Sequence, residues 1–143
     1  MSFSITIPNI EPLLDALARY PALAEPIIHR ATDQALMGLI PDLAHYPPEL
    51  PGQKYIRTND LGEEWKDAQP QWAAIPSGFE GSIDNPTPYG PDVQGHLTQA
   101  KIHHNRWQTD QQIVDKHNLE TEAIYDRALQ DIADAIDAHT QGA

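Results

Sequence analysis

The chain has 143 residues, of which 40% are hydrophobic and 21% are charged, the composition of an ordinary globular protein. Its formal net charge is −12, from 9 Lys and Arg against 21 Asp and Glu, which disfavours the attraction to phosphate that non-specific nucleic-acid binding requires. Cysteine is absent, so disulfides, thiolate zinc sites and a cysteine nucleophile are excluded. The sequence shows neither a signal peptide nor a run of about 20 apolar residues, so we expect a soluble protein made in the cytoplasm, without membrane contact.

The N-terminal part predicts one strand and two helices. Alternating apolar residues predict a half-buried strand over residues 3–7. A short helix follows to about Arg19, and a second helix starts a few residues before Pro26 and runs to about Ile40, where Pro41 ends or kinks it. The apolar face predicted for the second helix consists of Ile27 or Ile28, Ala31, Ala35, Leu36, Leu39 and Leu43.

The middle of the chain predicts a linker and a β-hairpin. The run HYPPELPGQ is too rich in proline for a regular helix or strand, so we assign a linker to residues 45–54. Two short runs, QWAAIPS and FEGSID, are separated near Ser77 and Gly78. Short apolar runs on either side of a turn are typical of an antiparallel hairpin.

A long final helix is the most clearly marked element. Thr109 and Gln112 have the spacing of a capping box, and the helix is expected to run to about Ala138, followed by a frayed tail at about residues 139–143. Its apolar positions recur at intervals near three and four: Ile113, Ala123, Ile124, Ala128, Ile132, Ala135 and Ile136. Together the elements predict a single α+β domain over residues 1–143, with N-terminal helices and a long C-terminal helix packed on a small antiparallel β-sheet.

The densest group of potential metal ligands is the pair His103 and His104, but adjacent side chains point in different directions and rarely ligate one ion together. The run IHHNRW, with Asn118 further on, has part of the histidine and asparagine order of HNH nucleases, with Arg127 near the place of the missing third histidine. The sequence has no Gly-x-Ser-x-Gly elbow and no phosphate-binding glycine loop. We therefore expect no catalytic residue, no cofactor and no metal, with a metal-dependent nuclease as an alternative.

Five large aromatic residues lie in polar surroundings without helical or strand periodicity: Tyr55, Trp65, Trp72, Tyr89 and Trp107. Aromatic rings supply much of the buried area in a small core, and they also anchor the centres of protein interfaces. Both interpretations are structural, and the sequence leaves both open.

Several short motifs occur in one order along the chain. The first half carries Tyr46-Pro47-Pro48, Tyr55, Arg57-Thr58, Leu61 and Trp65, and the second half carries PYGPDVQG and then AKIHHNRWQT. In this order they resemble the bacteriophage tail-component family of tail-completion, or head-tail joining, proteins of long-tailed phages and prophages. Asn59 stands where that family usually has glycine, which is a mild departure because asparagine tolerates a left-handed backbone best after glycine.

The resemblance implies a structural protein of the virion without catalysis. It implies a ring, hexameric by family expectation, at the head-proximal end of the tail tube, in contact with the tail tube protein and with neck or connector proteins. Genomic DNA would pass through the ring without specific binding, and surplus carboxylates suit such a channel because they repel phosphate. The expected location is therefore the virion tail or neck, and the host cytoplasm during assembly.

Scarce cations and interface composition suggest which residues join the subunits. Each Lys or Arg should attract a carboxylate, and interface cores favour Arg, Trp and Tyr. The candidate subunit-interface residues are Arg57, Trp65, Tyr89, Arg106 and Trp107. For Arg57 we favour a structural ion pair with a carboxylate. The alternatives to a virion protein are a phage-encoded metal-dependent nuclease and an acidic protein that mimics nucleic-acid charge.

Overall fold

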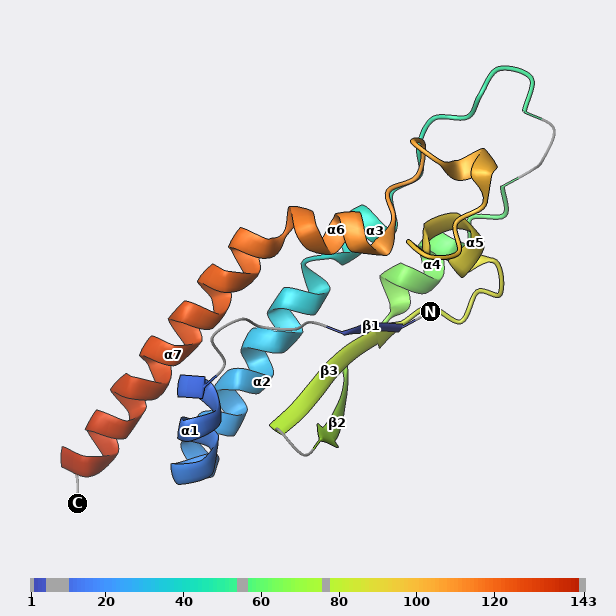
Figure 1. Cartoon of the computed structure of the whole chain (residues 1–143). Coiled ribbons are helices and arrows are strands. Elements are labelled where there is room, and N and C mark those ends of the chain that lie inside the picture. The colour runs from blue at the N-terminus through green and yellow to red at the C-terminus, as the bar shows by residue number, and fades with distance from the viewer. Residues whose placement is uncertain (1, 5–10, 54–56, 76–77, 142–143) are drawn as a thin grey trace.

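The computed structural model of the chain describes residues 2–4, 11–53, 57–75 and 78–141. Its elements in chain order are β1 (Ser2–Ser4), α1 (Glu11–Arg19), α2 (Pro21–Met37), α3 (Ile40–Leu43), α4 (Asp60–Asp67), β2 (Gln71–Ile75), β3 (Gly78–Asp84), α5 (Gly90–Gln94), the 3-10 helix η1 (Lys101–His103), α6 (Asp110–Lys116) and α7 (Asn118–Gln141). Figure 1 shows an elongated molecule in which helices and a small antiparallel sheet lie together, which confirms the α+β prediction.

The sheet has three strands in the order β1-β3-β2, and both pairings are antiparallel. The predicted hairpin is confirmed as β2 and β3, although residues 76–77 of its turn lie outside the described residues. Of the strand predicted over residues 3–7, the described part belongs to β1, where Phe3 pairs with Ile83. A Cβ built on Gly81 would lie 2.5 Å from Cγ2 of Thr32, so this glycine lets β3 approach α2 closely.

Of the three prolines in and after α2, only Pro41 differs from the prediction. Pro21 occupies the first turn of α2, where its missing N–H costs nothing, and Pro26 lies inside the helix as expected. The helix ends at Met37, before Pro41 is reached. Pro41 instead lies in the first turn of the short helix α3, so it begins a new helix and does not kink the old one.

The predicted final helix is two helices. The capping box is confirmed, with Gln112 N donating to Thr109 Oγ1 at 3.2 Å and Thr109 N donating to Gln112 Oε1 at 2.9 Å. The helix that it opens, α6, stops at Lys116, and α7 begins at Asn118. Of the tail predicted to fray, residues 139–141 belong to α7, and residues 142–143 lie outside the described residues.

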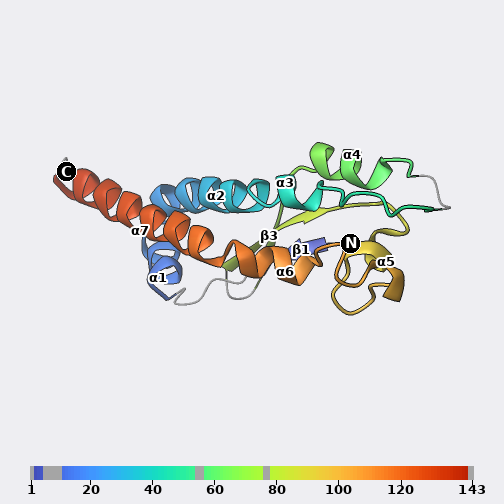
Figure 2. The ribbon, with the colours of Figure 1, turned by 90° about the horizontal axis from the view of Figure 1, so that it is seen from above.

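The buried side chains form two clusters that share α2. At one end, α1, α2 and α7 bury the first cluster, which contains Leu13, Ala16, Ala24, Ile28, Ala31, Ala35, Tyr125, Ala128 and Ile132. The helices α2 and α7 run side by side in opposite directions (Figures 1 and 2). The hydroxyls of Thr32 and Tyr125 share a hydrogen bond of 2.5 Å between them. In α7, Ala128 and Ile132 are buried as predicted and Ile124 is half-buried, but Ala123 is exposed.

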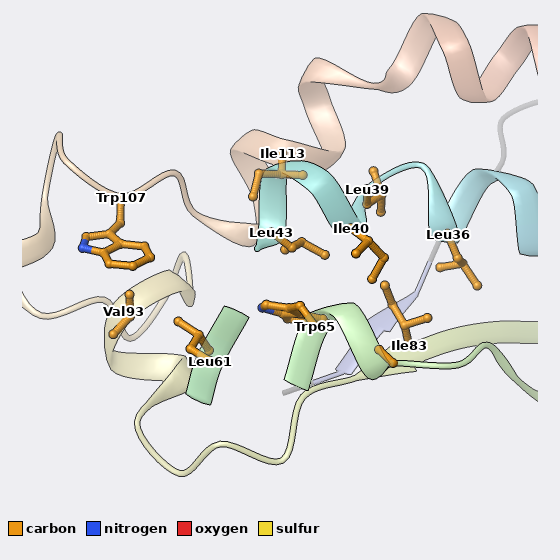
Figure 3. Close-up of a cluster of buried hydrophobic side chains, with 11 residues drawn as sticks. Leu36, Leu39, Ile40, Leu43, Leu61, Trp65, Ile83, Val93, Trp107 and Ile113 are labelled. Atoms are coloured by element: carbon orange, nitrogen blue, oxygen red, sulfur yellow. The ribbon is translucent and has the colours of Figure 1, made fainter. Parts of the chain in front are cut away.

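The second cluster lies at the other end, around the buried indole of Trp65 (Figure 3). It gathers apolar side chains from the end of α2, from α3 to α6 and from β3: Leu36, Leu39, Ile40, Leu43, Leu61, Trp65, Ala68, Ile83, Val93, Trp107 and Ile113. The apolar face predicted for the second helix is confirmed on α2 for Ile28, Ala31, Ala35 and Leu36, whereas Leu39 and Leu43 are buried beyond the end of that helix. In the part of the chain that the structure describes, no helix is both long and apolar enough to cross a bilayer.

His117 lies at the break between α6 and α7, and its contacts with Asp42 and Glu120 form what we call the histidine clamp. His117 Nε2 lies 2.6 Å from Asp42 Oδ2 of α3, and its Nδ1 lies 3.0 Å from Glu120 Oε2 of α7. Lys116 adds a contact of 3.2 Å to the same Asp42 carboxylate. The hydrogen bond to Asp42 raises the pKa of His117, and the same bond lowers the pKa of Asp42. The clamp therefore fixes the α6–α7 junction to α3 through charge.

The clamp predicts a stability that depends on pH. Because folding raises the pKa of His117, its contribution is complete below the ordinary value of 6.5 and is lost as the pH rises through the raised value. Because folding lowers the pKa of Asp42, its contribution is complete above 3.8 and is lost as the pH falls through the lowered value. In urea unfolding at about pH 5 and about pH 8.5, the His117→Gln variant should differ from wild type more at the lower pH.

The matched control is His139→Gln, since His139 is exposed in the last turn of α7. This change should leave the pH profile of the free energy of unfolding as it is in wild type. If wild type and His117→Gln lose the same stability between the two pH values, the clamp does not contribute as described.

Candidate functional site

A cleft of about 440 Å³ opens at the end of the molecule that holds α4, α5 and the loop after α5. Its walls come from three separate stretches of sequence: the linker, the turn before α4, and the region from Tyr89 to Trp107. The lining residues are Tyr46, Arg57, Thr58, Asn59, Leu61, Tyr89, Asp92, Val93, Ala100, Ile102, His103 and Trp107. Of the predicted interface residues, the cleft brings together Arg57, Tyr89 and Trp107.

Arg57 lies at the back of this cleft, with 12% of its side chain exposed. Its Nη1 donates to the carbonyl oxygen of Pro47 at 2.6 Å, and its guanidinium carbon lies 5.6 Å from the ring centres of both Tyr46 and Trp107. Its Nε and Nη2 are buried and have no hydrogen-bond partner among the described residues. A guanidinium between two aromatic rings is stabilised by the negative faces of the rings.

The carboxylate partner expected for Arg57 is Glu49, and the ion pair between them is long. Glu49 Oε1 lies 3.9 Å from Arg57 Nε, and the Glu49 side chain is 61% exposed. An ion pair of that length and exposure contributes little to stability. The predicted ion pair is thus present but long, and the closer partner of Arg57 is a backbone carbonyl of the linker, so Arg57 acts as a strut that fixes the linker to the start of α4.

The turn before α4 is shaped by Asn59 and Tyr46. Asn59 has φ 67° and ψ 3°, the left-handed conformation that the asparagine in place of glycine predicted. Gly62 N donates to Tyr46 Oη at 2.9 Å, and a Cβ on Gly62 would lie 2.8 Å from the Tyr46 ring. Burial raises the pKa of Tyr46, so its hydroxyl stays neutral. The linker is therefore held against α4 by both Tyr46 and Arg57.

Trp65 is fully buried, with 0% of its surface exposed (Figure 3). Its Nε1 donates to Gln94 Oε1 at 2.9 Å, and Gln94 Nε2 donates to the carbonyl oxygen of Leu43 at 2.8 Å. This chain of hydrogen bonds joins α4 to α5 and α5 to α3. Since Trp65 lies in the chain's own core and offers no surface to a neighbour, its predicted role at a subunit interface does not fit this position.

The other predicted residues line or flank the cleft. Tyr89 is 38% exposed, and its hydroxyl shares a hydrogen bond of 3.2 Å with the Thr58 hydroxyl. Trp107 is buried at 6% exposure and meets the Tyr46 ring edge to face at 5.0 Å. Arg106 Nη2 donates to the carbonyl oxygen of Pro48 at 3.3 Å. Tyr55, the remaining aromatic residue of the motif, lies outside the described residues.

The two adjacent histidines have different surroundings. Burial lowers the pKa of His103, whose ring meets Trp107 edge to face, so this imidazole is neutral near pH 7. His104 Nε2 lies 3.2 Å from the carbonyl oxygen of Gln99. No three His, Asp or Glu residues within the described ranges are grouped so that they could hold a metal ion. The arrangement that the structure does build is a cleft that can bind an apolar group against aromatic rings.

Sequence reasoning missed the role of Asn85, whose side chain is buried at 0% exposure. Its Nδ2 donates to the carbonyl oxygen of Leu61 at 2.9 Å, and its Oδ1 accepts from Thr87 N at 2.9 Å. The second of these bonds is an Asx turn, which the sequence Asn-Pro-Thr-Pro could have indicated. Asn85 thereby holds the segment between β3 and α5 against α4.

Comparisons of this chain with protein-family models, with curated proteins and with solved structures found no match.

The strut at Arg57 predicts a loss of stability in the isolated chain. Arg57→Met keeps most of the apolar stem but removes the charged hydrogen bond to Pro47, so it should lower the free energy of unfolding by about 1 to 3 kcal/mol. The matched control is Arg106→Met, whose longer and exposed bond to Pro48 predicts a loss below about 1 kcal/mol. Urea unfolding measures both. Equal losses in the two variants would contradict the strut.

Proposed function

We propose that this chain is a structural protein of a tailed-bacteriophage virion that completes the tail and joins it to the head. In this proposal, copies of the chain form a ring around the DNA channel at the head-proximal end of the tail tube. One side of the ring contacts the tail tube protein, and the other contacts the neck or connector proteins. The proposal starts from the ordered motifs that resemble the tail-completion family.

The observation that carries the proposal is that these motif residues hold one another in place. Tyr46 and Arg57 tie the linker to α4, and Trp65 is tied through Gln94 to α3 and α5. Trp107 completes the group by packing against Tyr46. A catalytic motif would direct reactive side chains toward one open site. Here Arg57 bonds to a backbone carbonyl, Tyr46 to a backbone N–H and Trp65 to a buried amide, which supports a structural role.

The distribution of carboxylates on the sheet supports passage of DNA. In β3, Gly81 and Ile83 are buried, whereas Glu80 and Asp84 are exposed and alternate with them. Where the side chains of the sheet are described, the face that points away from α2 thus carries two exposed carboxylates. Such a surface repels phosphate and does not retain DNA, which is what the wall of a channel needs.

One observation favours an acidic mimic of nucleic acid as the second candidate. All six Asp and Glu residues of α7 are exposed: Glu120, Glu122, Asp126, Asp131, Asp134 and Asp137. With 3.6 residues per turn, however, they spread over the whole solvent-facing half of the helix and do not follow one line. A mimic would act as a free protein on a DNA-binding partner, whereas a tail-completion protein would be present in virions.

The test is deletion of the gene from the phage or prophage that encodes it, with complementation by the wild-type gene. Electron microscopy of the deletion lysate should show separate DNA-filled heads and tails, and complementation should restore joined particles. Mass spectrometry of purified wild-type virions should detect the chain. Joined, infectious particles without the protein would contradict the proposal, as would its absence from wild-type virions.

A further inference from the structure

The loop between α5 and α6 differs in charge from the rest of this acidic chain. From Gly95 to Thr109 the sequence has no Asp or Glu, although the whole chain carries 21. The same stretch holds two of the 9 Lys and Arg residues and three of the 7 His residues. Lys101 and His104 are exposed on its surface, beside Leu97 at 86% and Ile102 at 59% exposure. Lys101 and Arg106 therefore make the loop cationic, and it also exposes large apolar side chains.

The outer face of α7 has the opposite charge. The buried stripe of this helix contains Tyr125, Ala128 and Ile132. With 3.6 residues per turn, the side that points away from that stripe carries Leu119, Ala123, Asp126, Gln130, Asp134 and Asp137, which are all exposed. Leu119 is 81% exposed, and Arg127 is the only Lys or Arg in the helix. This outer face is apolar where α7 begins and acidic further along.

The two surfaces cannot meet within one molecule. Figures 1 and 2 show α6 between the beginning of α7 and the loop after α5, and they place the far end of α7 at the opposite end of the elongated chain from that loop. A contact between them therefore requires a second copy. Large exposed apolar side chains surrounded by charge are typical of interaction sites, and a cationic surface in a protein of charge −12 has an oppositely charged partner in another copy of the same protein.

We infer that the loop from Gly95 to Thr109 of one copy docks on the outer face of α7 of the next copy. Leu97 and Ile102 lie against the apolar beginning of that face, and Lys101 and His104, which are close to Ile102 in the chain, lie against the exposed carboxylates next to it, Glu122 and Asp126. This contact joins different surfaces of the two copies, so repetition closes a ring if the rotation between copies allows it. The inference rests on the proposed function, because it names the surfaces through which the proposed ring is built.

The test exchanges the two charges. The loop variant is Lys101→Glu with His104→Glu, the helix variant is Glu122→Lys with Asp126→Lys, and a combined variant carries all four changes. Analytical ultracentrifugation at low salt should show self-association of wild type, which weakens as salt is added. Each two-residue variant should weaken it by about tenfold or more. The combined variant, and an equal mixture of the loop and helix variants, should associate again.

The control is Lys66→Glu, which reverses an exposed charge on α4, away from both surfaces. It should leave self-association unchanged, and circular dichroism should show every variant folded. The inference is overturned if wild type stays monomeric at all concentrations and salts, or if the combined variant associates no better than its parents. If the charge exchange does not change self-association and the protein is found in virions, this inference is contradicted and the proposed function is not. If self-association is lost and restored as the charges predict but the protein is absent from virions, the proposed function is contradicted and this inference is not.

Discussion

A single buried amide, that of Gln94, determines how the end of the molecule that holds the cleft is built. Its oxygen accepts from the Trp65 indole and its nitrogen donates to the Leu43 carbonyl, so α3, α4 and α5 are held at one point. Gln94 is 1% exposed, and a buried amide that loses its partners costs far more than an exposed one. The position of α5 then fixes Tyr89 and the cationic loop, and the position of α4 fixes Arg57.

The elongated shape follows from the way α2 is used. Ala35 belongs to the cluster with α1 and α7, and its neighbour Leu36 belongs to the cluster around Trp65. One helix thus serves two cores that lie end to end. This arrangement places the far end of α7 and the loop after α5 at opposite ends of the molecule (Figure 1).

The sequence was informative where the signal is local. The capping box of Thr109, the left-handed Asn59 and the hairpin before Asp84 each depend on a few neighbouring residues. The sequence did not predict features that depend on a residue far away in the chain. The helix breaks at His117, whose partner Asp42 is 75 residues away, and Arg57 binds a carbonyl that no charge pattern indicates. For Trp65 the sequence left core packing and interface anchoring open, and its burial at 0% exposure shows core packing.

If the motif residues act as a scaffold, a Gln94→Met variant should be clearly less stable than wild type. This change removes the amide from both the Trp65 indole and the Leu43 carbonyl while filling a similar volume. Urea unfolding should show a loss of at least about 2 kcal/mol in the free energy of unfolding, with almost none for Gln130→Met on the exposed side of α7. Equal stability of Gln94→Met and wild type would contradict it.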